Sequence, residues 1–341
     1  MSKSGKSRSV SRSAAGAERE SDVSAPRRWT DPGFLQSQGL LLILAGLMIF
    51  FSLKSPFFWA TSNLLNVAAS STVLAIMAAP QTFLIVSGGF DVSVGATIAI
   101  STVSLGLLLA AGVPMAAAIV VVLFIGLAVG AANATLVVLL RVNPLIATLG
   151  TMSIFTGLAH FLSSGQTEVV RNDFLRWITK TQVGPVSVLV FMFIGVYAIS
   201  IVLERTTVLG RWFYAIGGNA EAARLAGLPI RRVQYSLYIA SGLSASVGGV
   251  LLTGILQSAS PRVGDPFLLS VVTAVILGGA SLTGGRGSII GTLLAVAILG
   301  VLQNGFSLLL LPSSVQTIAL GIALIVAVVF DGMLRRIERR P

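Results

Sequence analysis

The sequence predicts an all-α polytopic membrane protein. Of its 341 residues, 55% are hydrophobic and only 10% are charged, and the mean hydropathy is +0.92. A soluble domain carries about 25% charged residues, so this chain lacks the polar surface that a water-facing globule needs. Its apolar stretches are continuous rather than alternating, which excludes an outer-membrane β-barrel. The chain has no cysteine and one histidine, which argues against disulfides, thiolate metal sites and histidine-based catalysis.

The formal net charge of +11 is concentrated in three segments. Residues 1–37, 204–232 and 332–341 together hold 16 of the 23 Lys and Arg residues. Cytoplasmic loops accumulate Lys and Arg, so we expect these segments, and therefore both termini, in the cytoplasm. Nucleic-acid binding needs a folded basic face, often with stacking aromatics, and the sequence indicates neither. Residues 1–37 are serine-rich and almost free of large apolar residues, which predicts a disordered tail.

A membrane-spanning helix needs about 20 apolar residues, and we predict about ten such helices. The stretches are Gly39–Leu53, Leu64–Gly88, Val92–Ala111, Met115–Leu140, Leu145–Leu162, Val186–Leu203, Tyr235–Leu256, Leu268–Leu277, Ile289–Leu311 and Val315–Phe330. Six precede the basic segment 204–232 and four follow it. Because both numbers are even, the three basic segments fall on one side of the membrane. Residues 38–332 are then the transmembrane domain, 163–184 is a loop on the opposite side, and 333–341 is a cytoplasmic tail.

The second stretch is interrupted by Pro80 and by the Gly88-Gly89 pair, so we expect a broken or kinked helix inside the bundle. Asp91 follows as the only acidic residue within 32–167. We expect it near the membrane interface, capping a helix that starts at Val92. The alternative is a polar group that lines a path through the bundle or relays protons. The candidate pathway or gate residues are Gln81, Thr82, Gly88, Gly89, Asp91, Asn133 and Asn304.

Two matches within the chain indicate a faint internal repeat. Segment 86–95 resembles 277–285 in its paired glycines and hydroxyl spacing, whereas Asn133 and Asn304 are each followed at one constant offset by a Leu-Gly pair. With ten spans, the first match implies parallel repeats and the second implies inverted ones. The orientation therefore stays open, as does the alternative that a glycine-rich loop is re-entrant.

The basic segment 204–232 contains signals for a short helix. Asn219 is a good N-cap, Glu221 suits the first turn, and Gly227 before Pro229 is a stop signal. A helix of about two turns over Asn219–Gly227 is too short to be stable alone in water. It must be held by the rest of its own chain and presented to a partner.

This segment carries a specific resemblance. Glu221-Ala222-Ala223 followed by Gly227 resembles the EAA loop of ATP-binding-cassette (ABC) importer permeases, and 214–225 resembles their monosaccharide branch, which includes permeases for ribose, xylose, arabinose and rhamnose. Segments 82–95 and 274–291 resemble the same family. The three motifs occur in the family's order, and the resemblance covers most of the chain beyond its N-terminal tail.

The resemblance implies a permease subunit in the bacterial inner membrane that moves a monosaccharide or related polyol by alternating access. The implied partners are a cytoplasmic ABC ATPase, an extracytoplasmic sugar-binding protein and a second permease copy, identical or not. The residues expected to contact the ATPase are Asn219, Glu221, Ala222, Ala223, Arg224 and Gly227. Arg286 is a second cytoplasmic contact or a positive-inside anchor.

The chain has no phosphate-binding loop of the Gly-x-x-x-x-Gly-Lys-Ser/Thr type. We therefore expect no catalytic residue, cofactor or metal in this chain, with ATP and Mg²⁺ held by the ATPase. The rival class is an ion-coupled secondary transporter of a small polar solute. Such a carrier normally uses buried carboxylates, and only Asp91 is available. A membrane enzyme would need an acid–base set, which one histidine cannot supply.

Overall fold

The computed structural model describes the backbone of residues 32–338 and the side chains of 38–329. Residues 1–31 and 339–341 of the predicted tails lie outside the described residues. Helix α1 begins at Pro32, inside the tail predicted at 1–37, and α14 continues past the boundary predicted at 332. The helices are α1 (Pro32–Lys54), α2 (Thr61–Ser70), α3 (Thr72–Val86), α4 (Val94–Ala110), α5 (Met115–Ala134), the π-helix η2 (Thr135–Leu139), α6 (Pro144–Leu162), α7 (Asp173–Lys180), α8 (Val188–Thr206), α9 (Val208–Gly218), α10 (Ala220–Leu225), α11 (Ile230–Leu256), α12 (Asp265–Leu277), α13 (Ile289–Leu308) and α14 (Ser313–Glu338).

The helices support a polytopic membrane protein, although the predicted count of about ten spans is not confirmed. Within the described residues, five helices are long and apolar enough to cross a membrane: α5 with η2, α6, α8, α11 and α13. The pair α2 and α3 makes a sixth if it is one span bent by 44°. Shorter apolar helices of 10–17 residues occupy the remaining predicted stretches, within α1, α4, α12 and α14.

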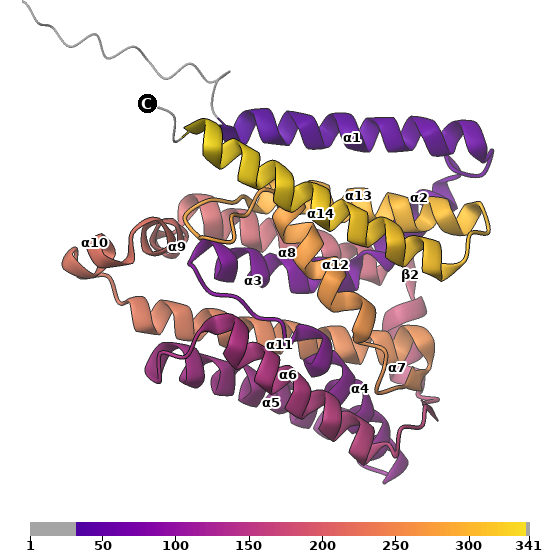
Figure 1. Ribbon diagram of the computed structural model, residues 1–341. Coiled ribbons are helices and arrows are strands. Elements are labelled where there is room, and N and C mark those ends of the chain that lie inside the picture. The colour runs from indigo at the N-terminus through magenta and orange to yellow at the C-terminus, as the bar shows by residue number, and fades with distance from the viewer. Residues whose placement is uncertain (1–31, 339–341) are drawn as a thin grey trace, which may run out of the picture.

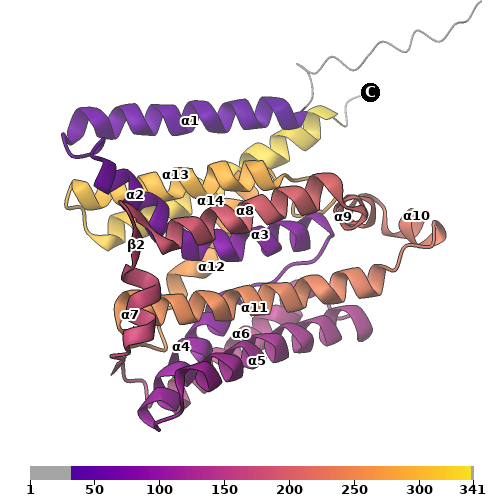
Figure 2. The same ribbon diagram turned by 180° about the vertical axis from the view of Figure 1, so that it is seen from behind.

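The long helices lie side by side in a bundle, with α10 at one end and α7 with strand β2 (Gln182–Val183) at the other (Figures 1 and 2). Strand β2 pairs with β3 (Val186–Ser187) in a hairpin, and β1 (Glu168–Val169) pairs antiparallel with β4 (Ser258–Ala259). Helix α11 packs against α3, α4 and α5, whereas α1 packs on α13 and α14 packs on α12.

Small residues bring α5 and α11 into backbone contact. A Cβ added at Gly126 would lie 2.5 Å from the carbonyl oxygen of Gly242, and one added at Gly130 would lie 2.5 Å from that of Tyr238. Membrane helices associate through such close packing because lipid supplies no hydrophobic drive between them. The glycines fix α5 against the central helix α11.

The helix break occurs, but not at Pro80. Helix α3 runs without interruption through Pro80, and the bend towards α2 lies at Ser71. All residues of α3 except Pro80 are buried, which agrees with the expectation that this segment lies inside the bundle. Neighbouring protein can there satisfy the carbonyl that the proline leaves without a donor. The second predicted break is present: residues 87–93 are not helical, and Gly88 has a φ of +84°. Glycine adopts that left-handed conformation without steric cost.

Candidate functional site

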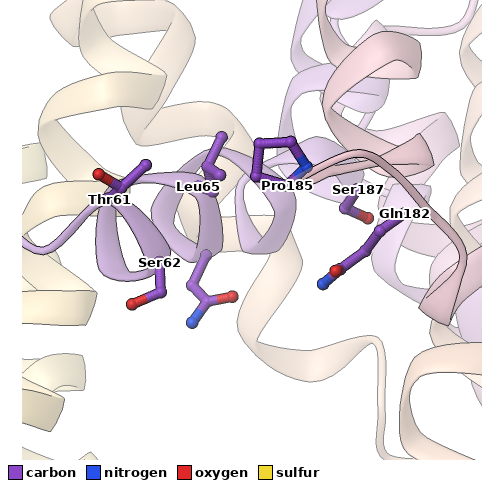
Figure 3. Close-up of a pocket in the computed structure, with 7 residues that line it drawn as sticks. Thr61, Ser62, Leu65, Gln182, Pro185 and Ser187 are labelled. Atoms are coloured by element: carbon purple, nitrogen blue, oxygen red, sulfur yellow. The ribbon is translucent and has the colours of Figure 1, made fainter.

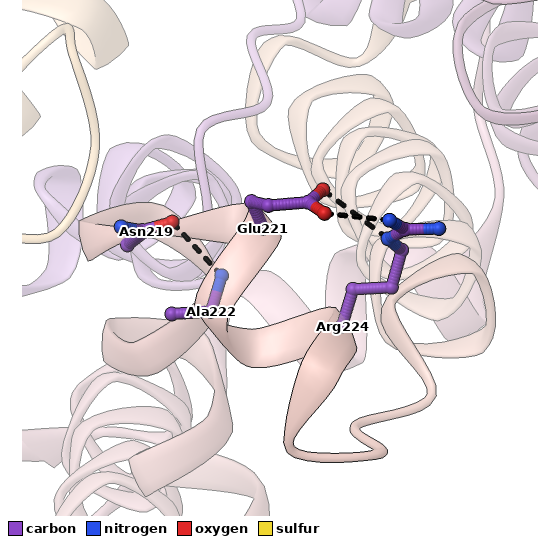
Figure 4. Close-up of polar contacts among 4 residues, drawn as sticks. All are labelled: Asn219, Glu221, Ala222 and Arg224. Carbon is purple, nitrogen blue, oxygen red and sulfur yellow. Dashed lines mark hydrogen bonds and ion pairs between the residues drawn. The ribbon is translucent and has the colours of Figure 1, made fainter.

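Helix α10 is the short helix expected in the basic segment. The side-chain oxygen of Asn219 accepts a hydrogen bond from the backbone N–H of Ala222 at 2.9 Å, which is the predicted N-cap (Figure 4). The helix itself covers only the six residues Ala220–Leu225, so it is shorter than the two turns expected over Asn219–Gly227. The remaining residues up to Gly227 form its terminating turn.

The end of α10 requires glycine. Gly227 has a φ of +79° and donates its N–H to the carbonyl of Arg224 at 3.0 Å. The N–H of Leu228 reaches back to the carbonyl of Ala223, also at 3.0 Å. These two bonds are the Schellman pattern, in which a left-handed glycine satisfies the last carbonyls of a helix. Leu228 packs on the cluster that contains the buried Ala223, so this end of α10 is anchored.

The opposite side of α10 is open. Ala222 and Leu225 are exposed, and Leu225 retains 78% of its accessible surface. Glu221 and Arg224 form an ion pair across one turn at 2.5 Å with about two thirds of each side chain exposed (Figure 4). Such an exposed pair adds little stability. The six predicted contact residues therefore divide into a buried anchor, two terminal caps and a presented face.

Helix α9, immediately before α10, meets two other segments backbone to backbone. A Cβ at Gly217 would overlap the carbonyl oxygen of Val86 and lie 2.5 Å from the amide nitrogen of Gly285. Gly285 has a φ of +77° and donates its N–H to Val86 at 2.8 Å. We call Val86, Gly217 and Gly285 the glycine junction. It joins the end of α3, the end of α9 and the loop 278–288.

Side chains reinforce the glycine junction. The hydroxyl of Tyr214 on α9 donates to a carboxylate oxygen of Glu204 at 2.6 Å and lies 3.0 Å from the carbonyl of Gly287. The same Glu204 oxygen accepts the N–H of Ile289 at 3.0 Å, at the N-terminus of α13, where a negative charge is favourable. Burial and the neighbouring Glu204 raise the pKa of Tyr214, so the phenol stays protonated as a donor.

The predicted second cytoplasmic contact, Arg286, lies in the loop that forms the glycine junction. Its carbonyl accepts the N–H of Ser281 at 3.0 Å, and the preceding Gly285 touches α9. Arg286 is therefore at the same end of the bundle as α10. Its role as partner contact or charge anchor stays a prediction.

A second polar site lies inside the bundle. One carboxylate oxygen of Asp91 accepts from the Ser93 hydroxyl at 2.6 Å, the Ser93 N–H at 2.9 Å and the Asn133 amide at 3.3 Å. The other oxygen accepts from the Ser241 hydroxyl at 2.7 Å. The Gln81 amide donates to the Asp91 carbonyl at 3.0 Å. These five residues, all buried, form what we call the carboxylate node.

The node corrects two expectations about Asp91. Helix α4 begins at Val94 rather than Val92, and Asp91 is not its N-cap. Ser241 is the twelfth residue of the 27-residue α11, so Asp91 lies beside the middle of that helix rather than near an interface. The reason is the non-helical segment 87–93, which carries Asp91 back into the bundle after α3 has ended.

The remaining pathway candidates are dispersed. The Thr82 hydroxyl pairs with that of Thr292 at 2.8 Å, and the amides of Asn304 and Asn63 bond each other reciprocally at 2.9 and 3.1 Å. Gly88 and Gly89 form the turn after α3. Only Gln81, Asp91 and Asn133 share a site. Sequence reasoning did not single out five participants: Ser93, Thr151, Glu204, Tyr214 and Ser241. Ser93 and Tyr214 lie inside the motifs that carry the family resemblance, whereas the other three offered only their polarity as a signal. The Thr151 hydroxyl donates to the side-chain amide oxygen of Asn133 at 2.6 Å.

Within the described residues, the structure combines apolar helices long enough to cross a membrane with a presented short helix, a glycine-packed junction and a buried polar node. Within residues 32–338, no group of three or more His, Cys, Asp or Glu side chains could hold a metal ion. The family comparison gives the class of protein. Residues 63–328 match the family described as branched-chain amino acid transport system / permease component, and the chain belongs to it.

Individual relatives are similar over most of their length. The chain is 36% identical to the ribose import permease protein RbsC of Bacillus subtilis, over 88% of this chain and 94% of that protein. It is 38% identical to the autoinducer 2 import system permease protein LsrD of Photorhabdus luminescens, covering 78% and 82%. The probable ABC transporter permease protein YphD of Escherichia coli is 36% identical, covering 87% and 89%. No solved structure matches the chain.

Proposed function

We propose that this chain is the membrane-spanning permease subunit of an ABC importer that translocates a monosaccharide or related polyol across the inner membrane. The observation that carries the proposal is the presented helix α10 in a member of the permease family whose named relatives include a ribose import permease. The proposed partners are a cytoplasmic ATPase that holds ATP and Mg²⁺, an extracytoplasmic sugar-binding protein and a second permease copy. The end of the bundle with α10, and both termini, then face the cytoplasm.

The ATPase contact is the open face of α10. Glu221, Ala222, Arg224 and Leu225 are exposed there, while the Asn219 cap and the Gly227 turn hold the helix in shape. A six-residue helix has no stability of its own, so its orientation depends on the anchoring of Ala223 and Leu228. Movement of a partner against this face is passed to α9 because only Asn219 separates the two helices.

From α9, the glycine junction offers a rigid route into the membrane. Backbone-to-backbone contact leaves no flexible side chain to absorb a displacement, and packed interfaces respond by switching rather than by deforming. A shift of Gly217 must therefore move Val86, Gly285 or both. Val86 ends α3, and the segment 87–93 that follows carries Asp91 into the carboxylate node.

In this scheme the carboxylate node restrains the non-helical segment 87–93 between α3 and α4. Four hydrogen bonds hold the Asp91 carboxylate to α5, to α11 and to the start of α4, so the non-helical segment cannot move without breaking some of them. A basic partner, which an ion-coupled relay would be expected to use, does not contact Asp91 within the described residues. The family and the ribose import relative favour the ATP-driven permease over the ion-coupled carrier.

Purification and reconstitution test the proposal. The permease should co-purify with a soluble ATPase, and vesicles that contain the assembled complex should accumulate a monosaccharide only when ATP and loaded binding protein are supplied. Alternating access then follows from ligands that bind the two conformations unequally. Accumulation driven by a proton or sodium gradient without ATP would replace the proposal with the carrier class.

A further inference from the structure

A cavity of about 280 Å³ lies at the end of the bundle opposite α10. Its seven lining residues come from two elements, the first turns of α2 and the β2–β3 hairpin. They are Thr61, Ser62, Leu65, Asn66, Gln182, Pro185 and Ser187. We call this cavity the outer pocket. Its volume lies just below the range of small-molecule sites, about 300–1,000 Å³, which suits a ligand of monosaccharide size.

The lining of the outer pocket is polar but carries no charge. It offers three hydroxyls and two amides beside two apolar side chains, Leu65 and Pro185. Figure 3 draws Leu65 and Pro185 in the upper part of the view and the polar ends of Ser62 and Gln182 below them, all lining the outer pocket. A sugar has the same division, with hydroxyl groups around a ring whose C–H faces are apolar.

The polar groups of the outer pocket are available. Among residues 38–329, the side chains of Thr61, Ser62, Asn66 and Gln182 make no hydrogen bond to another residue. The Ser187 hydroxyl accepts one N–H, that of Leu189 at 3.3 Å. Hydroxyls and amides can both donate and accept, which matches a polyol. A free amino acid would bring two charges to a lining that contains no charged side chain, and unpaired charges are costly to desolvate.

We propose that the outer pocket binds a neutral polyol, the transported sugar in transit, on the extracytoplasmic side of the permease. The proposal rests on the proposed function for its orientation. It also connects the substrate to coupling, because the helix pair α2–α3 bears the outer pocket on its first turns and the glycine junction at its end, with the 44° bend between them.

The chain contains no native cysteine, so single-cysteine protection is a direct test. We would label Gln182→Cys in purified permease with a maleimide, with and without one of four sugars (D-ribose, D-xylose, L-arabinose or L-rhamnose) or the amino acid L-leucine. The matched control is Gln166→Cys, an exposed glutamine in the loop before β1 that does not line the outer pocket. A small, half-enclosed polyol binds weakly, with a Kd on the order of 10 mM. Sugar at twice Kd should therefore slow labelling about threefold.

The outcomes separate the outer pocket from the proposed function. Protection of Gln182→Cys but not Gln166→Cys by at least one sugar, abolished by adding Asn66→Leu, supports the proposal. Protection by L-leucine instead would overturn the assignment to a neutral polyol. Absence of protection by all four sugars would refute the outer pocket, and ATP-driven sugar uptake by the wild-type complex would then show that the proposed function stands without it.

Discussion

The sharpest prediction concerns Gly217 at the glycine junction. In Gly217→Ala, the new Cβ lies 2.5 Å from the amide nitrogen of Gly285, whereas ordinary contact begins near 3.4 Å. The junction must therefore open by at least about 0.9 Å. A 2.8 Å hydrogen bond from Gly285 to Val86 does not survive a shift of that size between its partners. Overpacking costs about 1–3 kcal/mol and the lost bond about 0.5–1.5 kcal/mol, which together is about 1.5–4.5 kcal/mol against the packed arrangement.

The neighbouring glycine supplies a matched control. A Cβ at Gly218 meets nothing within 4 Å, so Gly218→Ala should behave like the wild type. Gly217→Ala should reach the membrane at normal levels, because the junction lies at one end of the bundle, and should still bind the ATPase, because α10 is intact. We expect its ATP hydrolysis to be uncoupled from sugar uptake in reconstituted vesicles. Wild-type uptake by Gly217→Ala would refute the claim that the junction transmits movement.

Three further predictions follow from the site. Gly227→Leu places a side chain at a φ of +79°, which costs of order 1–3 kcal/mol in the turn that ends α10. The variant should reach the membrane at a normal level, but it should not co-purify with the ATPase and should not support sugar uptake. Asp91→Ala removes the acceptor of the Ser93 N–H and hydroxyl and leaves the Ser241 hydroxyl only its 3.3 Å contact with Gln81, so it should lower thermal stability and uptake. Asp91→Asn keeps one acceptor oxygen and should retain more of both, whereas an obligatory proton relay would make Asn as inactive as Ala. Tyr214→Phe removes the donor to Glu204 and should reduce the coupling of ATP hydrolysis to uptake without changing expression. Because the Tyr214 pKa is raised, the wild-type contact should persist as pH rises from 6 to 9. Loss of coupling across that pH window would contradict this assignment.

Local signals in the sequence predicted local structure well. The apolar stretch Met115–Leu140 corresponds to α5 with η2. A single apolar stretch in a membrane forms a helix because only a helix satisfies all of its backbone hydrogen bonds internally. Asn219 caps α10 and Gly227 ends it, since capping depends on residues within one turn. The outline of α10 was therefore predictable.

Contacts between distant segments were not predictable. Gly217 and Gly285 are 68 residues apart, and nothing in either glycine indicates which backbone approaches it. Asp91 was placed near an interface because a span was assumed to run straight from Val92; the non-helical segment 87–93 moves it beside Ser241 instead. The region of Pro80 and Gly88-Gly89 was expected to be broken or kinked. The helix continues through Pro80 and is interrupted at 87–93, because a proline inside the bundle costs one backbone hydrogen bond whose free carbonyl neighbouring protein can satisfy.

We propose that ATP hydrolysis by a partner drives a neutral sugar through this permease. The most direct measurement is accumulation of a radiolabelled monosaccharide in proteoliposomes that contain the permease, its co-purified ATPase and an external binding protein. We predict accumulation that requires internal ATP, survives a proton ionophore and disappears in Gly217→Ala but not in Gly218→Ala. Accumulation without ATP that collapses with the ionophore would contradict the account.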